Sequence, residues 1–206
     1  MRVLIGCELS GVVRRAFRAR GHDAWSCDIY PCDDGDDHHY QADVMTVLDF
    51  GWDLAIFHPP CTYMSVSGLH WNKNNPVRAR KTDEAVEFAR RLLDAPIERI
   101  ALENPISCLS TRIRKPDQII QPWMFGDDAS KATCLWLKNL PLLVHNPECY
   151  YPPRLVQTRD GGCLRRWSNQ TDSGQNRLGP SPTRAKERSQ TYQGIANAFA
   201  DQWGSL

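Results

Sequence analysis

The sequence predicts an α/β protein with a mostly parallel central sheet, and two observations support this prediction. In the first half of the chain, short apolar runs alternate with amphipathic stretches, a pattern typical of parallel strands joined by crossover helices. Residues 53–58 and 99–105 carry continuous apolar runs, as expected of strands that are buried on both faces. The chain has 206 residues, of which 41% are hydrophobic, so we expect one hydrophobic core.

The first elements form one strand-helix-strand unit. Residues 2–6 and 23–29 are expected to form strands because both are apolar and short. Between them, residues 11–21 are expected to form a helix, because apolar residues recur on one face and a glycine marks the end. A second unit follows, in which a helix over residues 82–95, with Thr82 as its N-cap, lies between the two buried strands.

The C-terminal part has a weaker periodicity. We expect a short helix within residues 116–126 and a strand over residues 133–137. Apolar residues at four-residue steps predict a last helix over residues 191–204. The stretch before it is rich in Pro, Gly, Ser, Asn and Arg and is expected to be irregular. The chain therefore divides into an α/β core, a basic irregular segment and a closing helix, at residues 1–144, 145–190 and 191–206.

Charge and cysteine content exclude several classes of protein. Lys and Arg number 25 against 24 Asp and Glu, so any basic surface that attracts nucleic acid must be local. We expect a cytoplasmic protein, because there is no signal peptide and no run of the roughly 20 apolar residues that a membrane span needs. The eight cysteines are expected to be free, and no metal site is expected without a Cys-x-x-Cys pair. The acidic stretch at residues 32–40 lacks EF-hand spacing and is interpreted as a solvated loop.

In an open parallel sheet the ligand lies beyond the carboxyl ends of the strands, so residues that follow a strand are candidates for the site. After the first strand, Gly6, Ser10 and Gly11 leave room for a ligand at the start of a helix, although small residues there equally serve packing. After the second strand, Asp28 could accept both ribose hydroxyls of an adenosyl cofactor, and Asp43 could bind an adenine amino group. Both aspartates could instead be solvated loop residues.

Two later strands end in residues with chemical reactivity. One strand runs into Pro59 and Pro60, which fix the backbone and end the sheet, so Cys61 lies on a stiff loop at the ligand edge. The next strand places Glu103 at the same edge, where a buried acid is costly unless it has a partner or binds a substrate. A thiol and a carboxyl are therefore expected to face one pocket.

A thiol, a carboxyl and an adenosyl cofactor together suit methyl transfer to carbon 5 of cytosine. That carbon is a poor nucleophile until a thiolate adds to carbon 6. We expect Cys61 to form this bond while a protonated Glu103 holds ring nitrogen 3 and the exocyclic amine, and S-adenosylmethionine to supply the methyl group. This role requires Glu103 to have a pKa near neutrality.

The same residues resemble a known family. The sequence DLAIFHPPCTYMS at residues 53–65 resembles the Pro-Cys motif of cytosine carbon-5 DNA methyltransferases, and ALENP at 101–105 is similar to their Glu-Asn-Val motif. GCELSGVVRRAF at 6–17 resembles their first cofactor motif, and YQGIANAFA at 192–200 resembles their closing Gly-Asn-Ala motif. The likeness is strongest to short phage and prophage members and does not extend to residues 145–189.

The resemblance implies a Rossmann-like S-adenosylmethionine-dependent methyltransferase that acts on DNA, with the target base flipped or single-stranded. It implies Cys61 as nucleophile and Glu103, with its neighbour Asn104, as the groups that hold the base. The candidate cofactor residues are Gly6, Glu8, Ser10, Gly11, Asp28, Asp43, Pro59 and Asn197. The candidate substrate residues are Pro60, Ser65, Lys131, Arg165, Arg166 and Trp167.

The chain departs from the family pattern at several points. Glu8 stands where the first loop glycine is expected, Pro105 replaces valine, and no Gln-x-Arg-x-Arg string follows the glutamate motif. Lys131 could serve the positioning role of that string, although a lysine before a strand is more often simply solvated.

Residues 145–190 take the place of the family's recognition domain. Basic and aromatic residues are interleaved there, including Arg165, Arg166 and Trp167, which suits phosphate contact and base stacking. A solvated loop with an aromatic anchor explains the composition equally well. If the segment binds DNA, its small size predicts little sequence preference.

Two other functions remain open from the sequence. The same pocket could methylate a free cytosine nucleotide, which would explain the short recognition segment. Alternatively, Glu8 in place of glycine would fit a catalytically silent protein that binds a cofactor or nucleic acid.

Overall fold

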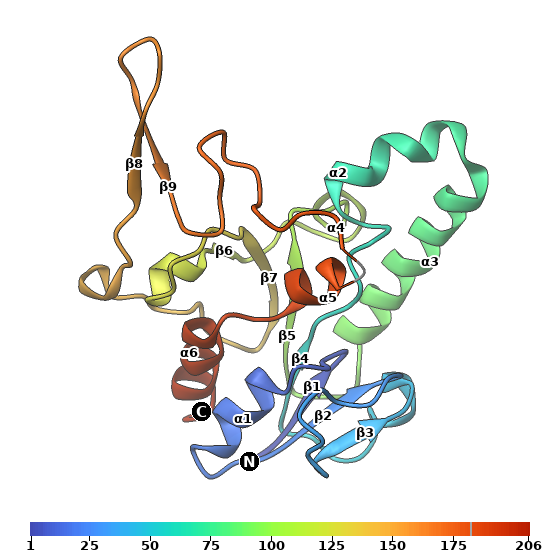
Figure 1. Ribbon diagram of the computed structural model, residues 1–206. Helices are drawn as coiled ribbons and strands as arrows, with labels where there is room; N and C mark the ends of the chain where they lie inside the picture. The colour runs from blue at the N-terminus through green and yellow to red at the C-terminus, as the bar shows by residue number, and fades with distance from the viewer. Residues whose placement is uncertain (182) are drawn as a thin grey trace.

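The computed structural model describes residues 1–181 and 183–206, which form an α/β structure around a seven-stranded sheet (Figure 1). The strands of this sheet are β1 (Arg2–Gly6), β2 (Asp23–Asp28), β3 (His39–Gln41), β4 (Leu54–Phe57), β5 (Arg99–Pro105), β6 (Gln118–Ile120) and β7 (Thr133–Lys138). Their order is β3-β2-β1-β4-β5-β7-β6, and β7 runs in the direction opposite to the other six described strands of this sheet. The predicted α/β class with a mostly parallel sheet is confirmed.

Helices cover both faces of the sheet. They are α1 (Val12–Arg18), α2 (Val66–Leu69), α3 (Pro76–Leu93), α4 (Leu109–Arg112), α5 (Arg184–Ser189) and α6 (Gln193–Trp203). Short 3-10 turns are η1 (Val44–Thr46), η2 (His70–Asn74), η3 (Pro122–Phe125) and η4 (Pro147–Cys149). Among the described helices, none has both the length and the apolar character needed to cross a membrane.

The hydrophobic interior consists of two clusters, one on each face of the sheet. On one face, Phe17 of α1 and Phe199 of α6 pack with Ile56 of β4. On the other face, Leu92 of α3 packs with Phe57 of β4. All five side chains are fully buried. The central strands are therefore covered on both sides, as their continuous apolar runs predict.

The strand order reverses between β1 and β4, because β2 and β3 lie on one side of β1 and the later strands lie on the other. In open α/β sheets this reversal opens a crevice at the carboxyl ends of the two strands. The loops that follow β1 and β4 begin at Cys7 and His58, so both the predicted cofactor loop and the Cys61 loop lie at this crevice.

The predicted start of the second helix was wrong. α3 begins at Pro76, and the side chain of Asn75 caps it by accepting a hydrogen bond from the backbone N–H of Arg78 at 2.9 Å. Thr82 lies buried inside the helix, where its hydroxyl donates to the carbonyl of Tyr63 at 2.8 Å. Thr82 therefore ties α3 to the loop that carries Cys61.

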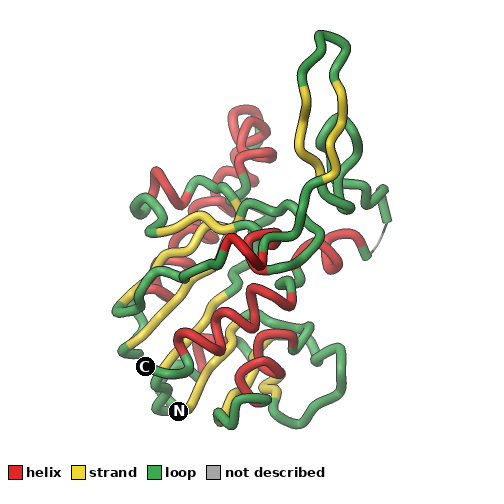
Figure 2. Tube along the Cα trace, turned by 90° about the vertical axis from the view of Figure 1, so that its left-hand side faces the viewer, coloured by secondary structure: helices red, strands yellow, loops and turns green. Residues whose placement is uncertain are grey.

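Two other segments differ from the expectation. Residues 116–126 were expected to contain a short helix. The short 3-10 helix η3 lies in this stretch, but Gln118–Ile120 before it pairs with β7 as the edge strand β6. Residues 145–190, described here except for residue 182, were expected to be irregular. They include the hairpin formed by β8 (Arg154–Gln157) and β9 (Cys163–Arg166), which projects from the body of the molecule in both views (Figures 1 and 2), and α5.

The acidic loop before β3 is not simply solvated. The guanidinium of Arg14, whose side chain is fully buried, donates to both carboxylate oxygens of Asp34 at 2.7 and 2.6 Å, and Asp36 lies 3.6 Å away. Arg14 also donates to the hydroxyl of Ser26 in β2 at 2.7 Å. This network fixes the acidic loop against the start of α1.

Candidate active site

Cys61 lies on a short, well-anchored loop after β4. The amide of Asn104 donates to the carbonyl of Pro59 at 3.0 Å, which ties this loop to β5. The carbonyl of Cys61 accepts hydrogen bonds from the backbone N–H groups of Met64 and Ser65 at 3.0 and 2.9 Å, so the loop closes into a turn. Cys61 itself is half-buried, and Pro60 beside it is exposed. The thiol is thus held in place yet reachable from solvent.

Glu103 lies on β5 beside His58. Ile56 of β4 pairs with Ala101 of β5, and two residues further along the two parallel strands come His58 and Glu103, on the same face of the sheet. The Nδ1 atom of His58 lies 3.3 Å from Oε2 of Glu103, and both side chains are only 9% exposed. His58 is not among the residues predicted from the sequence, although it is the first polar residue after the apolar strand.

The carboxyl of Glu103 is ionised in the free protein. Burial alone raises its pKa, but the positive charge of Lys131 and hydrogen bonds from His58 and Thr133 outweigh burial and lower the pKa to about 2. The expectation of a pKa near neutrality was therefore wrong for the protein without substrate. The reason is that Lys131 and His58, which are distant from Glu103 in sequence, both stabilise the carboxylate.

The thiol of Cys61 is protonated in the free protein. Burial and the negative charge of Glu103 raise its pKa, while the positive charges of Lys131 and Arg188 oppose this effect in part. These contributions place the charges of Glu103 and Lys131 near the Cys61 thiol. Arg188, from α5, joins this cluster and was not predicted from the sequence.

Lys131 is held in position rather than simply solvated. Its Nζ atom donates to the carbonyl of Gln190 at 3.1 Å, and its backbone N–H donates to the side chain of Gln121 at 2.9 Å. Gln190 directly follows α5, so Lys131 links β7 to the last part of the segment at residues 145–190.

Glu8 caps helix α1. Its carboxylate accepts hydrogen bonds from the backbone N–H groups of Val13 and Arg14 at 2.7 and 3.3 Å, and the residue is only 5% exposed. Burial raises the pKa of Glu8, while His58 and the two N–H groups act in the opposite direction. The hydroxyl of Ser10 lies 3.4 Å from the same carboxylate. A glutamate in place of a glycine thus has a structural role here.

The two glycines of this loop have structural roles as well. A Cβ atom on Gly6 would lie 2.5 Å from the ring of Phe57, so the Phe57 side chain of β4 can pack against β1 only if residue 6 has no side chain. Gly11 is the N-cap of α1 with a φ of 65°, a conformation that favours glycine. Packing and backbone geometry therefore account for both residues without a ligand.

Asp28 and Asp43 lie near each other at the ends of β2 and β3. The carboxylate of Asp28 accepts a hydrogen bond from the N–H of Tyr30 at 3.1 Å, and that of Asp43 accepts one from Met45 at 2.9 Å. Burial raises the pKa of the Cys7 thiol, and both aspartates raise it further, so both carboxylates lie close to the end of β1. The structure brings them together beside the crevice.

Buried polar atoms without partners gather around the Cys61 loop. Within the described chain, they include Nε2 of His58, Oδ1 of Asn104 and Oγ of Ser107. Ser107 forms a bridge with Ser65, directly after the Cys61 turn. Such atoms are uncommon in folded proteins and are often explained by a bound water or ligand. A substrate bound at this edge of the sheet would lie next to these atoms and would supply hydrogen-bond partners for them.

Comparisons with known proteins assign no family. No protein-family model and no curated protein matches the chain. Among solved structures, the chain is similar to an E. coli prophage-encoded protein described as a DNA modification methyltransferase, with a TM-score of 0.40 and 13% sequence identity. This similarity covers 66% of the chain and 46% of that protein, so less than half of its length is matched. A likeness this distant carries no argument about function.

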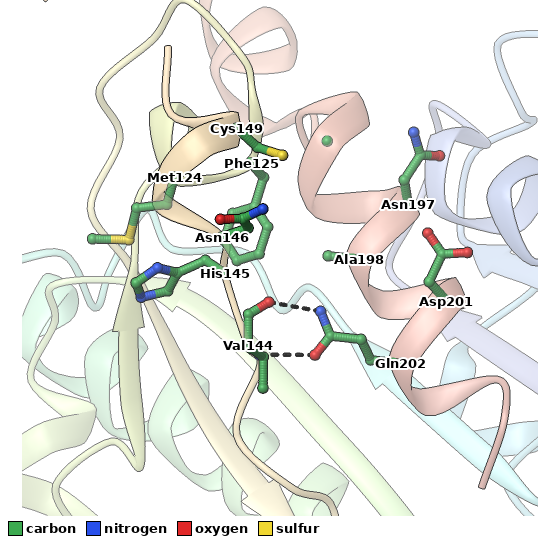
Figure 3. Close-up of a pocket in the computed structure, with 11 residues that line it drawn as sticks. Met124, Phe125, Val144, His145, Asn146, Cys149, Asn197, Ala198, Asp201 and Gln202 are labelled. Carbon is green, nitrogen blue, oxygen red and sulfur yellow. Dashed lines mark hydrogen bonds between the residues drawn. The ribbon is translucent and has the colours of Figure 1, made fainter. Parts of the chain in front are cut away.

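Asn197 of α6 lines a groove of about 240 Å³ between α6 and the segments around Phe125 and Asn146 (Figure 3). None of the other predicted site residues lines this groove. The side chain of Asn197 accepts a hydrogen bond from Gln193 at 3.0 Å.

The predicted substrate residues of the last segment lie on or below the hairpin. Arg165 and Arg166 belong to β9, and Arg166 donates to the carbonyl of Asp172 at 3.0 Å. Trp167 is 9% exposed and stacks on Trp123 with ring centroids 5.2 Å apart. The Trp167 ring therefore packs inside the protein. This agrees with the alternative that the tryptophan anchors a solvated loop, and not with stacking on a base.

Proposed function

We propose that the protein is an S-adenosylmethionine-dependent DNA methyltransferase that acts on carbon 5 of cytosine. The observation that carries this proposal is the meeting of Cys61 and Glu103 at the carboxyl edge of the sheet. Cys61 follows β4 and Glu103 lies on β5, and the negative charge of Glu103 contributes to the raised pKa of the Cys61 thiol. The Pro-Cys and Glu-Asn motifs around the same two residues support it.

The protonation states define the first chemical step. In the free protein the thiol holds a proton and Glu103 does not. When the sulfur of Cys61 bonds to carbon 6 of cytosine, the thiol loses its proton and nitrogen 3 gains one. Glu103 can take the proton from the thiol and pass it to nitrogen 3, so the site needs no external acid.

The later steps restore the ring. Once the sulfur is attached, carbon 5 is enamine-like and can take the methyl group that bound S-adenosylmethionine supplies. A water molecule then takes the carbon 5 proton, the bond between sulfur and carbon 6 breaks, and Cys61 leaves as a thiolate. The nitrogen 3 proton returns through Glu103 to this thiolate, which restores the neutral base and the thiol. Lys131 and His58 stabilise the Glu103 carboxylate before and after this cycle.

The cofactor proposal fits the charges at the crevice. A bare helix N-terminus attracts phosphate, but the start of α1 is already capped by the Glu8 carboxylate. A nucleotide phosphate is therefore disfavoured there, whereas a ligand with a sulfonium and an ammonium group is not. Asp28 and Asp43 would hold its adenosyl part. Calorimetry should detect binding of S-adenosylmethionine but not of ATP, and Asp28→Asn should weaken that binding.

The projecting hairpin suits contact with DNA. A two-stranded ribbon fits the major groove of B-DNA, and Arg159 and Arg165 give the hairpin positive charge. Leu155 and Leu164 are 65% and 39% exposed, so apolar side chains are also presented to a partner. The hairpin has only a few side chains to read bases, so we expect short or weak sequence preference.

The decisive experiment incubates the protein with S-adenosylmethionine and mixed DNA and measures 5-methylcytosine by mass spectrometry. Cys61→Ser should abolish the product, while Cys149→Ser, which alters an exposed thiol, should not. DNA that contains 5-fluorocytosine should form a covalent complex with the wild-type protein only. Absence of product on any cytosine-containing DNA, or full activity of Cys61→Ser, would refute the proposal.

Methylation of a free nucleotide is a second candidate. It is favoured by the internal packing of Trp167, which leaves this ring unavailable for stacking on a DNA base. Turnover on dCMP compared with turnover on DNA distinguishes the two substrates.

A further inference from the structure

His58 occupies a central place among the acids of the crevice. Its Nδ1 atom faces Glu103 at 3.3 Å, and it lies close enough to Glu8 to lower the pKa of that residue. Glu8, after β1, and Glu103, on β5, are the acids that face it, and Cys61 follows on the same loop. The positive charge of Lys131 acts on Glu103 and Cys61, and that of Arg188 acts on Cys61.

The hydrogen-bonding state of His58 follows from its partner. An ionised carboxylate only accepts hydrogen bonds, so Nδ1 carries the proton that it donates to Glu103. The other ring nitrogen, Nε2, is buried, and within the described chain it has no hydrogen-bond partner. A histidine kept only for packing would not be expected to leave a buried nitrogen unpaired. A buried polar atom without a hydrogen-bond partner costs free energy, and residues that carry such a cost are typical of functional sites.

We propose that His58 is the positioning residue of Glu103, an inference that rests on the proposed methyl transfer. The Nδ1–H group holds Oε2 from the side, and together with the hydrogen bond from Thr133 it fixes the plane in which the carboxyl meets the base. Without this contact, Lys131 would attract the carboxylate from another direction. Because His58 is buried between β1 and β5, its own ring has little freedom to turn.

The test compares two amide substitutions that differ in where the donor lies. In His58→Asn the side-chain N–H₂ takes the place of Nδ1, whereas in His58→Gln it reaches the place of Nε2. We expect His58→Gln to lower kcat on the order of 10- to 100-fold with KM for DNA unchanged, because misplacement of a reacting group lowers the rate and not the binding. His58→Asn should retain kcat within about fivefold, and His70→Asn, which changes an exposed histidine, should match the wild type.

A second measurement does not depend on activity. With ¹³C-labelled glutamate, the pKa of Glu103 should rise in His58→Gln and stay near the wild-type value in His58→Asn. If the wild type transfers no methyl group, the proposed function fails while this titration still tests the contact. Equal kcat in the wild type and His58→Gln, or an unchanged pKa of Glu103 in His58→Gln, would overturn the role of His58. Equal losses in both variants would do the same.

Discussion

Arg14→Met tests the buried charge network beneath the crevice. The arginine side chain is fully buried and donates to Ser26 and to both oxygens of Asp34, so methionine fills its volume but supplies no donor. Breaking a buried ion pair costs about 3–5 kcal/mol. Asp34 is 25% exposed and keeps its contact with Arg15, so we expect the lower end, about 3 kcal/mol. For a chain of this size the melting temperature should fall by about 6–12 °C.

The matched control is Arg15→Met, which removes a second partner of the same aspartate. The side chain of Arg15 is 48% exposed, so its loss should cost less than about 1 kcal/mol. Thermal unfolding followed by circular dichroism measures both variants. If the melting temperatures of the two variants agree, the buried network does not stabilise the fold and the reasoning is refuted.

The contribution of Asp34 to the free energy of unfolding depends on pH. Burial raises the pKa of Asp34, but the hydrogen bonds and charge of Arg14 lower it far below its ordinary value of 3.8. Asp34 therefore stabilises the folded state at pH values above 3.8, and this contribution is lost as the pH falls toward the folded-state pKa. Acidification should destabilise the wild type more than Arg14→Met, as urea unfolding at pH 7 and pH 3 would measure.

Three further predictions follow from the site and the hairpin. Glu103→Gln removes a negative charge that raises the pKa of the Cys61 thiol, so alkylation of Cys61 by iodoacetamide near neutral pH should become several-fold faster. An unchanged rate would show that Glu103 does not act on this thiol. Trp167→Ala should cost about 3 kcal/mol and speed proteolysis of the last segment, since its ring is buried in a stack. Replacing Arg159 and Arg165 by glutamine should leave the melting temperature unchanged but reduce the salt dependence of DNA binding by about one ion per arginine, and a constant slope would argue against contact.

The strands were predictable because burial on both faces leaves a clear pattern in sequence. The bounds of β1 and β5 match the expected residues 2–6 and 99–105. The start of α3 was missed because the residues around Thr82 look like a helix start, while the true cap at Asn75 follows another short helical turn. Local patterns thus locate an element better than they locate its ends.

The candidate site was predictable only in part. Cys61 follows β4, Glu103 lies near the end of β5, and both have recognisable neighbours, so the sequence is enough to name them as candidates. His58 is recognisable as a partner of Glu103 only once the register of β4 and β5 is known. Lys131 reaches the site from a distant segment, and its charge, together with His58, lowers the pKa of Glu103 instead of raising it. Arg188, also from a distant segment, opposes the rise in the pKa of Cys61. A pKa that depends on residues from several segments cannot be predicted from the sequence of any one segment.

The connection between the hairpin and Lys131 explains how so short a segment can serve a site. Asn169, just after the hairpin, accepts a hydrogen bond from the N–H of Ser130 at 3.0 Å and donates to its carbonyl at 2.9 Å. Ser130 directly precedes Lys131, whose Nζ atom is held in turn by Gln190. The lysine that keeps Glu103 ionised is therefore fixed at both ends by the segment proposed to contact DNA. A partner that binds this segment also acts on the charge next to Glu103, so the proposed recognition and the proposed chemistry need not be carried by separate domains.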